Sequence, residues 1–232
     1  MRTIKAHHKA EYEPIGDLVT YRAMPTSHFP MNQLDPFIFL NHHGRQVYPP
    51  FNNGLPFGPH PHRGFETVTF ILEGDVMHID SSGGSSTIKA GGVQWMTAGS
   101  GLVHAEVSSP AFKQKGGPLE LLQLWINLPA QHKMTEPRYI GLQQEDIPVM
   151  HWDENRVRGQ LIAGEWEDIT APVASLSGVH LASLQFSTGG RLNQNVAKEQ
   201  TVFLYVVKGD LLINGEIATM HHIVQFSNEG TM

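Results

Sequence analysis

Two short segments of the chain carry potential metal ligands at alternate positions. His60 and His62 flank a single proline. His104 and Glu106 flank a single alanine. Alternate side chains project from the same face of an extended strand, and the proline between the first pair favours an extended conformation for His60. The two segments therefore predict two β-strands that face each other and enclose a pocket of imidazole and carboxylate groups.

The composition indicates an all-β protein. The chain has 232 residues, of which 40% are hydrophobic and 16% are charged, as is typical of globular proteins. It contains 23 Gly and 15 Pro, and its aromatic and β-branched residues occur in short runs that turn residues separate. This pattern favours strands joined by turns over a helical bundle.

Charge and the absence of cysteine limit the chemistry. Without Cys, the chain has no disulfides, thiolate ligands or cysteine nucleophiles, so a metal would be held by histidine and carboxylate. The net charge is -6 and no dense basic stretch occurs, so we predict no direct nucleic-acid partner. No apolar run reaches the roughly 18 residues of a membrane helix, and the N-terminus lacks the apolar core of a signal peptide. We therefore predict a cytoplasmic protein with no membrane partner.

The chain divides into two halves with related patterns. Residues 68–75 form an apolar run that ends in Glu-Gly-Asp, and residues 203–210 form one that ends in Lys-Gly-Asp. This weak internal repeat indicates duplicated barrels. A polar stretch between residues 129 and 152, punctuated by proline, is typical of a connector. We predict an N-terminal metal-binding domain at residues 1–140 and a C-terminal metal-free domain at residues 150–232, which has Asn and Gln where the repeat would place a His pair.

Several motifs resemble those of the pirin family, a branch of the cupin superfamily. They are Pro59-His60-Pro61-His62-Arg63-Gly64-Phe65-Glu66-Thr67, Gln94-Trp95-Met96-Thr97-Ala98-Gly99, His104-Ala105-Glu106, Leu124-Trp125-Ile126-Asn127-Leu128 and Glu136-Pro137-Arg138-Tyr139. The resemblance implies two tandem cupin β-barrels of the jelly-roll type, with one Fe(2+) per chain, or another divalent transition metal, in the first barrel. It implies that the metal ligands are His60, His62, His104 and Glu106. Relative to the family the C-terminal domain is truncated, so we expect an incomplete second barrel and self-association through its open strand edges.

Two carboxylates compete for the fourth ligand position. Glu66 follows His62 by four residues, as in cupins generally, and would share its face if no bulge intervenes. Spacing alone leaves both Glu66 and Glu106 open. The resemblance to pirins favours Glu106, and we then expect Glu66 to have a structural or supporting role. His78, in an alternating strand, is expected to be a core histidine with satisfied hydrogen bonds.

The resemblance implies two alternative functions. The first is a mononuclear non-haem iron dioxygenase that opens flavonols of the quercetin type, with a small aromatic substrate and dioxygen as partners. Glu106 would then be both ligand and catalytic base. The second is a non-enzymatic, iron-dependent regulator that acts through protein-protein contacts, because the pirin family also includes nuclear proteins thought to modulate transcription-factor complexes.

Overall fold

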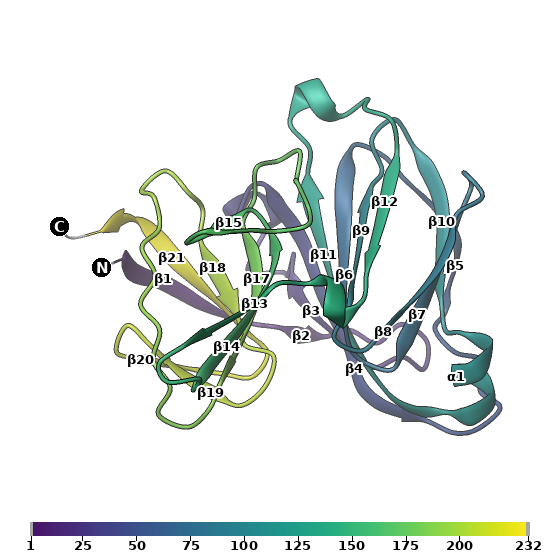
Figure 1. Ribbon diagram of the computed structural model, residues 1–232, viewed down its shortest axis with the longest axis horizontal. Helices are drawn as coiled ribbons and strands as arrows, with labels where there is room; N and C mark the ends of the chain where they lie inside the picture. The colour runs from purple at the N-terminus through teal and green to yellow at the C-terminus, as the bar shows by residue number, and fades with distance from the viewer. Residues whose placement is uncertain (1, 231–232) are drawn as a thin grey trace.

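The structure is a computed structural model that describes residues 2–230, and it confirms the all-β class. Strands dominate both halves of the molecule (Figure 1). The helical elements in the described residues are short: they are α1 (Pro110–Lys115), η1 (Met31–Gln33), η2 (Ala130–His132) and η3 (Gln144–Asp146). No helix in this part of the chain has the length and hydropathy needed to cross a membrane.

Two antiparallel sheets form the first barrel, on the right of Figure 1. The larger sheet has seven strands in the order β12-β9-β6-β11-β4-β3-β2, and the smaller has four in the order β5-β10-β7-β8. The strands of the larger sheet are β2 (Glu11–Tyr12), β3 (Thr20–Met24), β4 (Phe37–Tyr48), β6 (Phe65–Glu73), β9 (Val93–Thr97), β11 (Gly117–Asn127) and β12 (Arg138–Leu142). Those of the smaller sheet are β5 (Phe57–His62), β7 (Asp75–Asp80), β8 (Ser85–Lys89) and β10 (Leu102–Val107).

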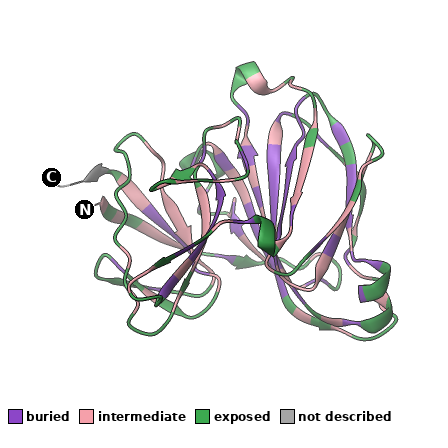
Figure 2. Ribbon diagram, viewed as in Figure 1, coloured by how far each residue is buried: buried purple, intermediate pink, exposed green. Residues whose placement is uncertain are grey.

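The central strands of the larger sheet are buried on both faces, as Figure 2 shows. On β6, Val68 belongs to a core cluster that includes residues of the C-terminal half, such as Ile162 and Val173. Ile71 of the same strand lies in a different cluster, together with Leu119 and other residues of the barrel. A strand covered on both faces can carry apolar residues at consecutive positions, which explains why Phe70, Ile71 and Leu72 follow one another in β6.

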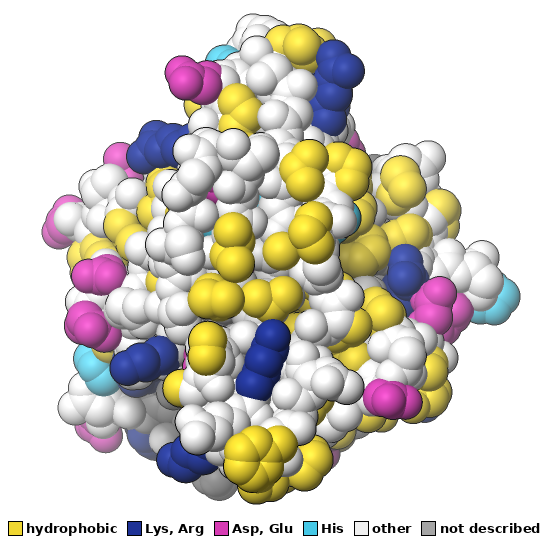
Figure 3. Space-filling model, turned by 90° about the vertical axis from the view of Figure 1, so that its right-hand side faces the viewer, with side chains coloured by type: hydrophobic (Ala, Val, Ile, Leu, Met, Phe, Trp, Pro, Cys, Tyr) yellow, Lys and Arg dark blue, Asp and Glu magenta, His cyan; other side chains and the backbone are white. Residues whose placement is uncertain are grey.

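One face of the smaller sheet meets solvent, so exposed and buried side chains alternate along parts of its strands. Ile79 and Val103 are 43% and 45% exposed on the neighbouring strands β7 and β10, and Figure 3 shows hydrophobic side chains spread over this side of the molecule. The adjacent residues His78 and His104 point the other way and are only 1% and 2% exposed. The two-residue period of a strand thus directs these histidines into the barrel.

The C-terminal half is built from smaller sheets, on the left of Figure 1. One three-stranded sheet has the order β13-β14-β17 and another has the order β1-β21-β18. Their strands are β13 (Val149–Trp152), β14 (Val157–Ala163), β17 (Leu181–Phe186), β1 (Arg2–Lys9), β21 (His222–Gly230) and β18 (Phe203–Tyr205). Two ribbons complete this half, β15 (Glu165–Trp166) with β16 (Ile169–Thr170) and β19 (Asp210–Ile213) with β20 (Glu216–Thr219).

The first strand departs from the predicted division of the chain. Residues 1–140 were assigned to one domain, whereas β1 pairs antiparallel with β21 in the C-terminal half. Ile4 packs against a small core there that contains Val206 and Val224. Residues 2–9 therefore pair with the C-terminal half, and such a pairing between the two ends of a chain leaves no trace in local patterns. The remaining boundaries at residues 1–140 and 150–232 stay a prediction.

The turn between β9 and β10 should tolerate no side chain at Gly99. Its φ is +49°, and an added Cβ would lie 2.1 Å from the carbonyl oxygen of Thr135. Gly16 has a similar φ of +57° but open space around it. We expect Gly16→Ala to lower the free energy of unfolding by about 1–2 kcal/mol through backbone strain alone. Gly99→Ala should lower it by roughly 1–3 kcal/mol more, because a backbone atom must move. Urea denaturation measures both, and equal losses would contradict this account.

A buried histidine in the barrel wall should make stability depend on pH. His43 of β4 is 1% exposed, and its Nδ1 lies 2.8 Å from the hydroxyl of Thr20. Burial, and then the charges of His42 and Arg22, lower the pKa of His43 from 6.5 to about 3. As the pH falls, His43 in the unfolded chain is protonated near pH 6.5, whereas in the folded chain it is protonated only near pH 3. Between these pH values the unfolded chain binds more protons than the folded chain, so the free energy of unfolding falls as the pH falls.

We expect this loss to be smaller in His43→Gln, which cannot titrate. Between pH 6.5 and pH 4, the free energy of unfolding of the wild type should fall more steeply than that of the variant, by up to about 1.4 kcal/mol per pH unit. Urea denaturation of the metal-free proteins at several pH values measures the difference. Parallel pH profiles would show that His43 does not carry the effect.

Candidate metal centre

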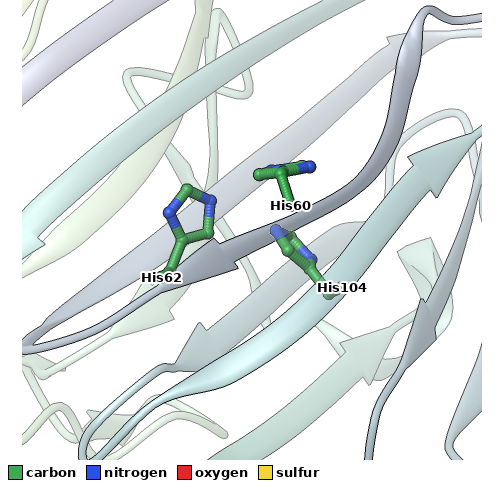
Figure 4. A group of neighbouring side chains, drawn as sticks. All are labelled: His60, His62 and His104. Carbon is green, nitrogen blue, oxygen red and sulfur yellow. The ribbon is translucent and has the colours of Figure 1, made fainter.

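Three histidines converge at the pairing of β5 with β10. The strands run antiparallel with His104 opposite His60, and His62 lies two residues further along β5. One ring nitrogen from each histidine can be chosen so that all three lie within 4.8 Å of one another. Figure 4 shows the rings of His60 and His62 from one strand and of His104 from its neighbour turned toward a common point. The alternation read from the sequence is thus realised on two adjacent strands.

The hydrogen-bond pattern of these rings fits a metal ion. The Nε2 atoms of His62 and His104 are buried and have no hydrogen-bond partner. The Nδ1 of His60 lies 2.7 Å from the backbone oxygen of Gly58, to which it donates in the neutral ring, so its Nε2 keeps a lone pair. A buried polar atom without a partner costs about 1–3 kcal/mol. A cation at the centre of the three rings would remove this cost.

The protonation of the rings also suits metal binding. Burial, and then the proximity of His60, lowers the pKa of His62 to about 4. Burial, and then His60, His62 and His78, lowers the pKa of His104 to about 3. Both imidazoles are therefore neutral at pH 7, which is the form that donates a lone pair to a transition metal.

Glu106, the predicted fourth ligand, lies in the barrel but outside this close group. Its carboxylate accepts hydrogen bonds from the Thr69 hydroxyl, at 2.6 Å, and from the side-chain amide of Gln123. A bulge interrupts the register of β10 against β5 between His104 and Glu106. Burial raises the pKa of Glu106. Its role as a ligand stays a prediction, which requires the carboxylate to turn toward the histidines.

Glu66 points to the other face of the larger sheet. Its carboxylate accepts hydrogen bonds from the indole of Trp95 at 3.0 Å, and from the hydroxyls of Thr97 at 2.8 Å and Ser175 at 3.1 Å. Ser175 belongs to the C-terminal half, and Val68, two residues after Glu66, packs toward the same half. Glu66 therefore links the two halves, which agrees with the structural role expected for it.

His78 has a closer connection to the site than the sequence indicated. It is buried as expected, but its Nδ1 lies 3.3 Å from Nδ1 of His104 and its Nε2 lies 2.8 Å from Oδ2 of Asp80. Burial alone would raise the pKa of Asp80, but hydrogen bonds from Ser82, His78 and Gly84 bring it down to about 2. The spacing of His78 and Asp80 repeats the alternation of the two ligand pairs, and this was the signal available in the sequence.

Aromatic side chains form the wall beside His62. The rings of Phe65 and Trp125 lie 5.0 Å and 5.1 Å from the ring of His62, and they stack on each other at 4.8 Å. Phe39 stacks on Trp125 at 4.2 Å. The Nε1 of Trp125 is buried without a hydrogen-bond partner. This wall offers a flat apolar surface with one unused donor next to the histidines.

Comparison with known proteins places these features in a family. The Pirin family model matches residues 18–126. Pirin-1 of Arabidopsis thaliana is 40% identical over 197 residues, which are 83% of this chain and 64% of Pirin-1. A Pseudomonas aeruginosa protein that is named as a candidate quercetin 2,3-dioxygenase is 36% identical over 204 residues, 88% of this chain and 69% of that protein. The chain thus spans about two thirds of the length of these relatives.

The fold is shared with solved structures. The crystal structure of a quercetin 2,3-dioxygenase from Acinetobacter baumannii is similar with a TM-score of 0.82 and 33% identity, covering 99% of this chain and 81% of that chain. This similarity confirms the predicted cupin-type fold in two halves. From these matches in sequence and fold, we conclude that the chain belongs to the pirin family.

Proposed function

We propose that this protein is an iron-dependent dioxygenase that opens flavonols of the quercetin type. The observation that carries the proposal is the convergence of His60, His62 and His104, with two buried ring nitrogens that lack partners, next to an aromatic wall. A set of imidazoles with a carboxylate suits ferrous iron. The names of the similar proteins from Pseudomonas aeruginosa and Acinetobacter baumannii support flavonols as the substrate class.

Bound iron would supply Lewis acidity toward a substrate hydroxyl and the redox capacity that a reaction with dioxygen requires. His60, His62 and His104 would hold it, with Glu106 as the fourth ligand. The buried position of these side chains, apart from the half-buried His60, would keep water away from the reacting atoms.

Glu106 is suited to accept the proton of the substrate hydroxyl. Burial raises its pKa, which makes the carboxylate a stronger base than an exposed glutamate. Thr69 and Gln123 donate hydrogen bonds to its two oxygens and hold it at the inner face of the barrel. The proton of the substrate would pass to a carboxylate oxygen as the hydroxyl becomes an anion.

The aromatic wall is suited to bind a planar ring system. Phe65 and Trp125 present stacked rings beside His62, where a flat aromatic substrate can pack against them. The free Nε1–H of Trp125 can donate a hydrogen bond to a substrate oxygen. These contacts would orient the substrate toward the metal and Glu106.

The alternative remains an iron-dependent regulator that acts through protein contacts, in which the same centre binds iron without turnover. Protein partners, self-association through the C-terminal half and a cytoplasmic location also stay predictions. The choice of iron over other divalent transition metals belongs to the proposal as well.

Oxygen consumption and carbon monoxide release test the proposal directly. The protein would be loaded with ferrous iron without oxygen and then mixed with quercetin in aerated buffer. We expect the wild type to consume oxygen and to release one carbon monoxide for each oxygen consumed. The surface variant His151→Ala should do so at the same rate as the wild type. His62→Ala should bind less than one iron per chain and lose activity. Glu106→Gln should still bind iron through the three histidines, but it should turn over about 10²–10⁴-fold more slowly, since a general base contributes that much.

Two outcomes would count against this function. If the wild type binds one iron per chain but consumes no oxygen with any of a panel of flavonols, the dioxygenase is excluded and the regulator is favoured. If the reconstituted wild type binds no iron, both functions fail.

A further inference from the structure

We propose that Asp80 and His78 are positioning residues that set the tautomer of His104, so that the nitrogen of His104 that faces the metal keeps a free lone pair. The inference rests on the metal centre of the proposed function but not on its substrate. The three side chains form a line of hydrogen bonds from a surface turn to the centre, with Asp80 Oδ2 at 2.8 Å from His78 Nε2 and His78 Nδ1 at 3.3 Å from His104 Nδ1.

The line begins at a carboxylate whose orientation the backbone fixes. Asp80 ends β7, and its Oδ1 accepts the backbone N–H groups of Ser82, at 2.8 Å, and Gly84, at 3.3 Å. The hydroxyl of Ser82 donates to the same oxygen. Because Oδ1 is occupied by these donors, Oδ2 is the oxygen that faces His78. The side chains of His78 and Asp80 are both only 2% exposed, so water does not compete for this contact.

In our proposal the rings of His78 and His104 are both neutral, and the direction of every hydrogen bond in the line then follows from the carboxylate. An ionised carboxylate only accepts hydrogen bonds, so Nε2 of His78 must carry the proton. A neutral His78 then has a bare Nδ1 that accepts from Nδ1–H of His104. His104 in turn is left with a bare Nε2, the atom that is buried without a partner in the centre. Tyr139 stacks on the ring of His78 at 3.9 Å and 14°, which keeps that ring in the orientation the line requires.

His60 also keeps a lone pair on its Nε2, but its tautomer is set by the backbone and not by a side chain. Its Nδ1 donates to the backbone oxygen of Gly58, an acceptor that no substitution of a side chain removes. His104 depends instead on a side-chain carboxylate two hydrogen bonds away. Ring nitrogens of metal ligands commonly have such partners, and their loss typically weakens metal binding about 10–100-fold. Asp80 is therefore the position at which a small chemical change should alter the metal centre from outside it.

Asp80→Asn should reverse the line. The oxygen of the new amide remains needed by the backbone N–H groups of Ser82 and Gly84, so its NH₂ group faces His78 Nε2 and donates to it. His78 then carries its proton on Nδ1 and donates to His104. The proton of His104 moves to Nε2, where it occupies the position of the metal.

Two measurements test this reversal. In the metal-free proteins near pH 7.5, ¹⁵N NMR of the imidazoles should find His104 protonated on Nδ1 in the wild type and on Nε2 in Asp80→Asn. Competition with a chromophoric chelator under anaerobic conditions should show about 10–100-fold weaker Fe(2+) binding by the variant. Asp153→Asn is the matched control, because Asp153 also accepts a backbone N–H, from Arg191 at 2.8 Å, but lies in the C-terminal half. It should change neither readout.

A double-mutant cycle separates this role from general stability of the turn. His78→Phe keeps a flat ring against Tyr139 but breaks the line, so it should weaken Fe(2+) binding by itself, and Asp80→Asn should then add nothing. The inference is overturned if Asp80→Asn leaves the His104 tautomer and the Fe(2+) affinity unchanged, or if its effect persists in the His78→Phe background. If Asp80→Asn fails to fold, an unchanged Fe(2+) affinity of His78→Phe overturns it equally. A wild type that binds no Fe(2+) would refute the proposed function, while the NMR comparison would still decide this inference.

Discussion

The antiparallel pairing of β10 with β5 on one side and with β7 on the other is the constraint on which the centre depends. It places His60 opposite His104 and Glu106 opposite His78, on strands whose alternate residues share one face. The exposed Ile79 and Val103 on the outer face show that the alternation is kept across these strands. A shift of one residue in either pairing would turn the histidines to solvent and the apolar side chains inward. The hydrophobic pattern of this small sheet therefore fixes the orientation of the histidines that we propose as metal ligands.

The polar interior created in this way is stable because most of its groups have partners across the barrel. Thr69 and Gln123 of the larger sheet bind the carboxylate of Glu106, which comes from the smaller sheet. Among the buried atoms that lack partners are Nε2 of His62, Nε2 of His104 and Nε1 of Trp125 beside them. A bound ion is one explanation for buried polar atoms without partners, and it fits nitrogens that lie together in a cluster of three histidines. An ion bound at the three histidines would therefore also give partners to the buried ring nitrogens of His62 and His104.

Much of the site could be predicted from the sequence because it follows from local alternation. His60, His62 and His104 were identified from spacing alone, and the structure brings their rings together. The choice between Glu66 and Glu106 could not be made in this way, because it depends on which face of β6 meets the barrel. That face is decided by packing against residues of the C-terminal half, such as Val173. The same limit explains why the contact of His78 with His104 was missed.

The pairing of β1 with β21 shows the limit most clearly. The residues that pair, such as Lys9 and His222, lie at opposite ends of the chain. The sequence near either strand does not predict which strand it pairs with. Long-range pairings of this kind are set by the packing of whole sheets. In contrast, the turn at Gly99 and the strands around the histidines follow from the conformational preferences of a few neighbouring residues.

The central claim is that three imidazoles from two neighbouring strands hold one metal ion. A crystal structure of the protein loaded anaerobically with Fe(2+), with diffraction data collected at the iron absorption edge, tests it most directly. The account predicts one anomalous peak per chain, bound by Nε2 of His62, Nε2 of His104 and a ring nitrogen of His60. An anomalous peak elsewhere in the molecule, or none at these histidines in protein shown to contain one iron per chain, would contradict it.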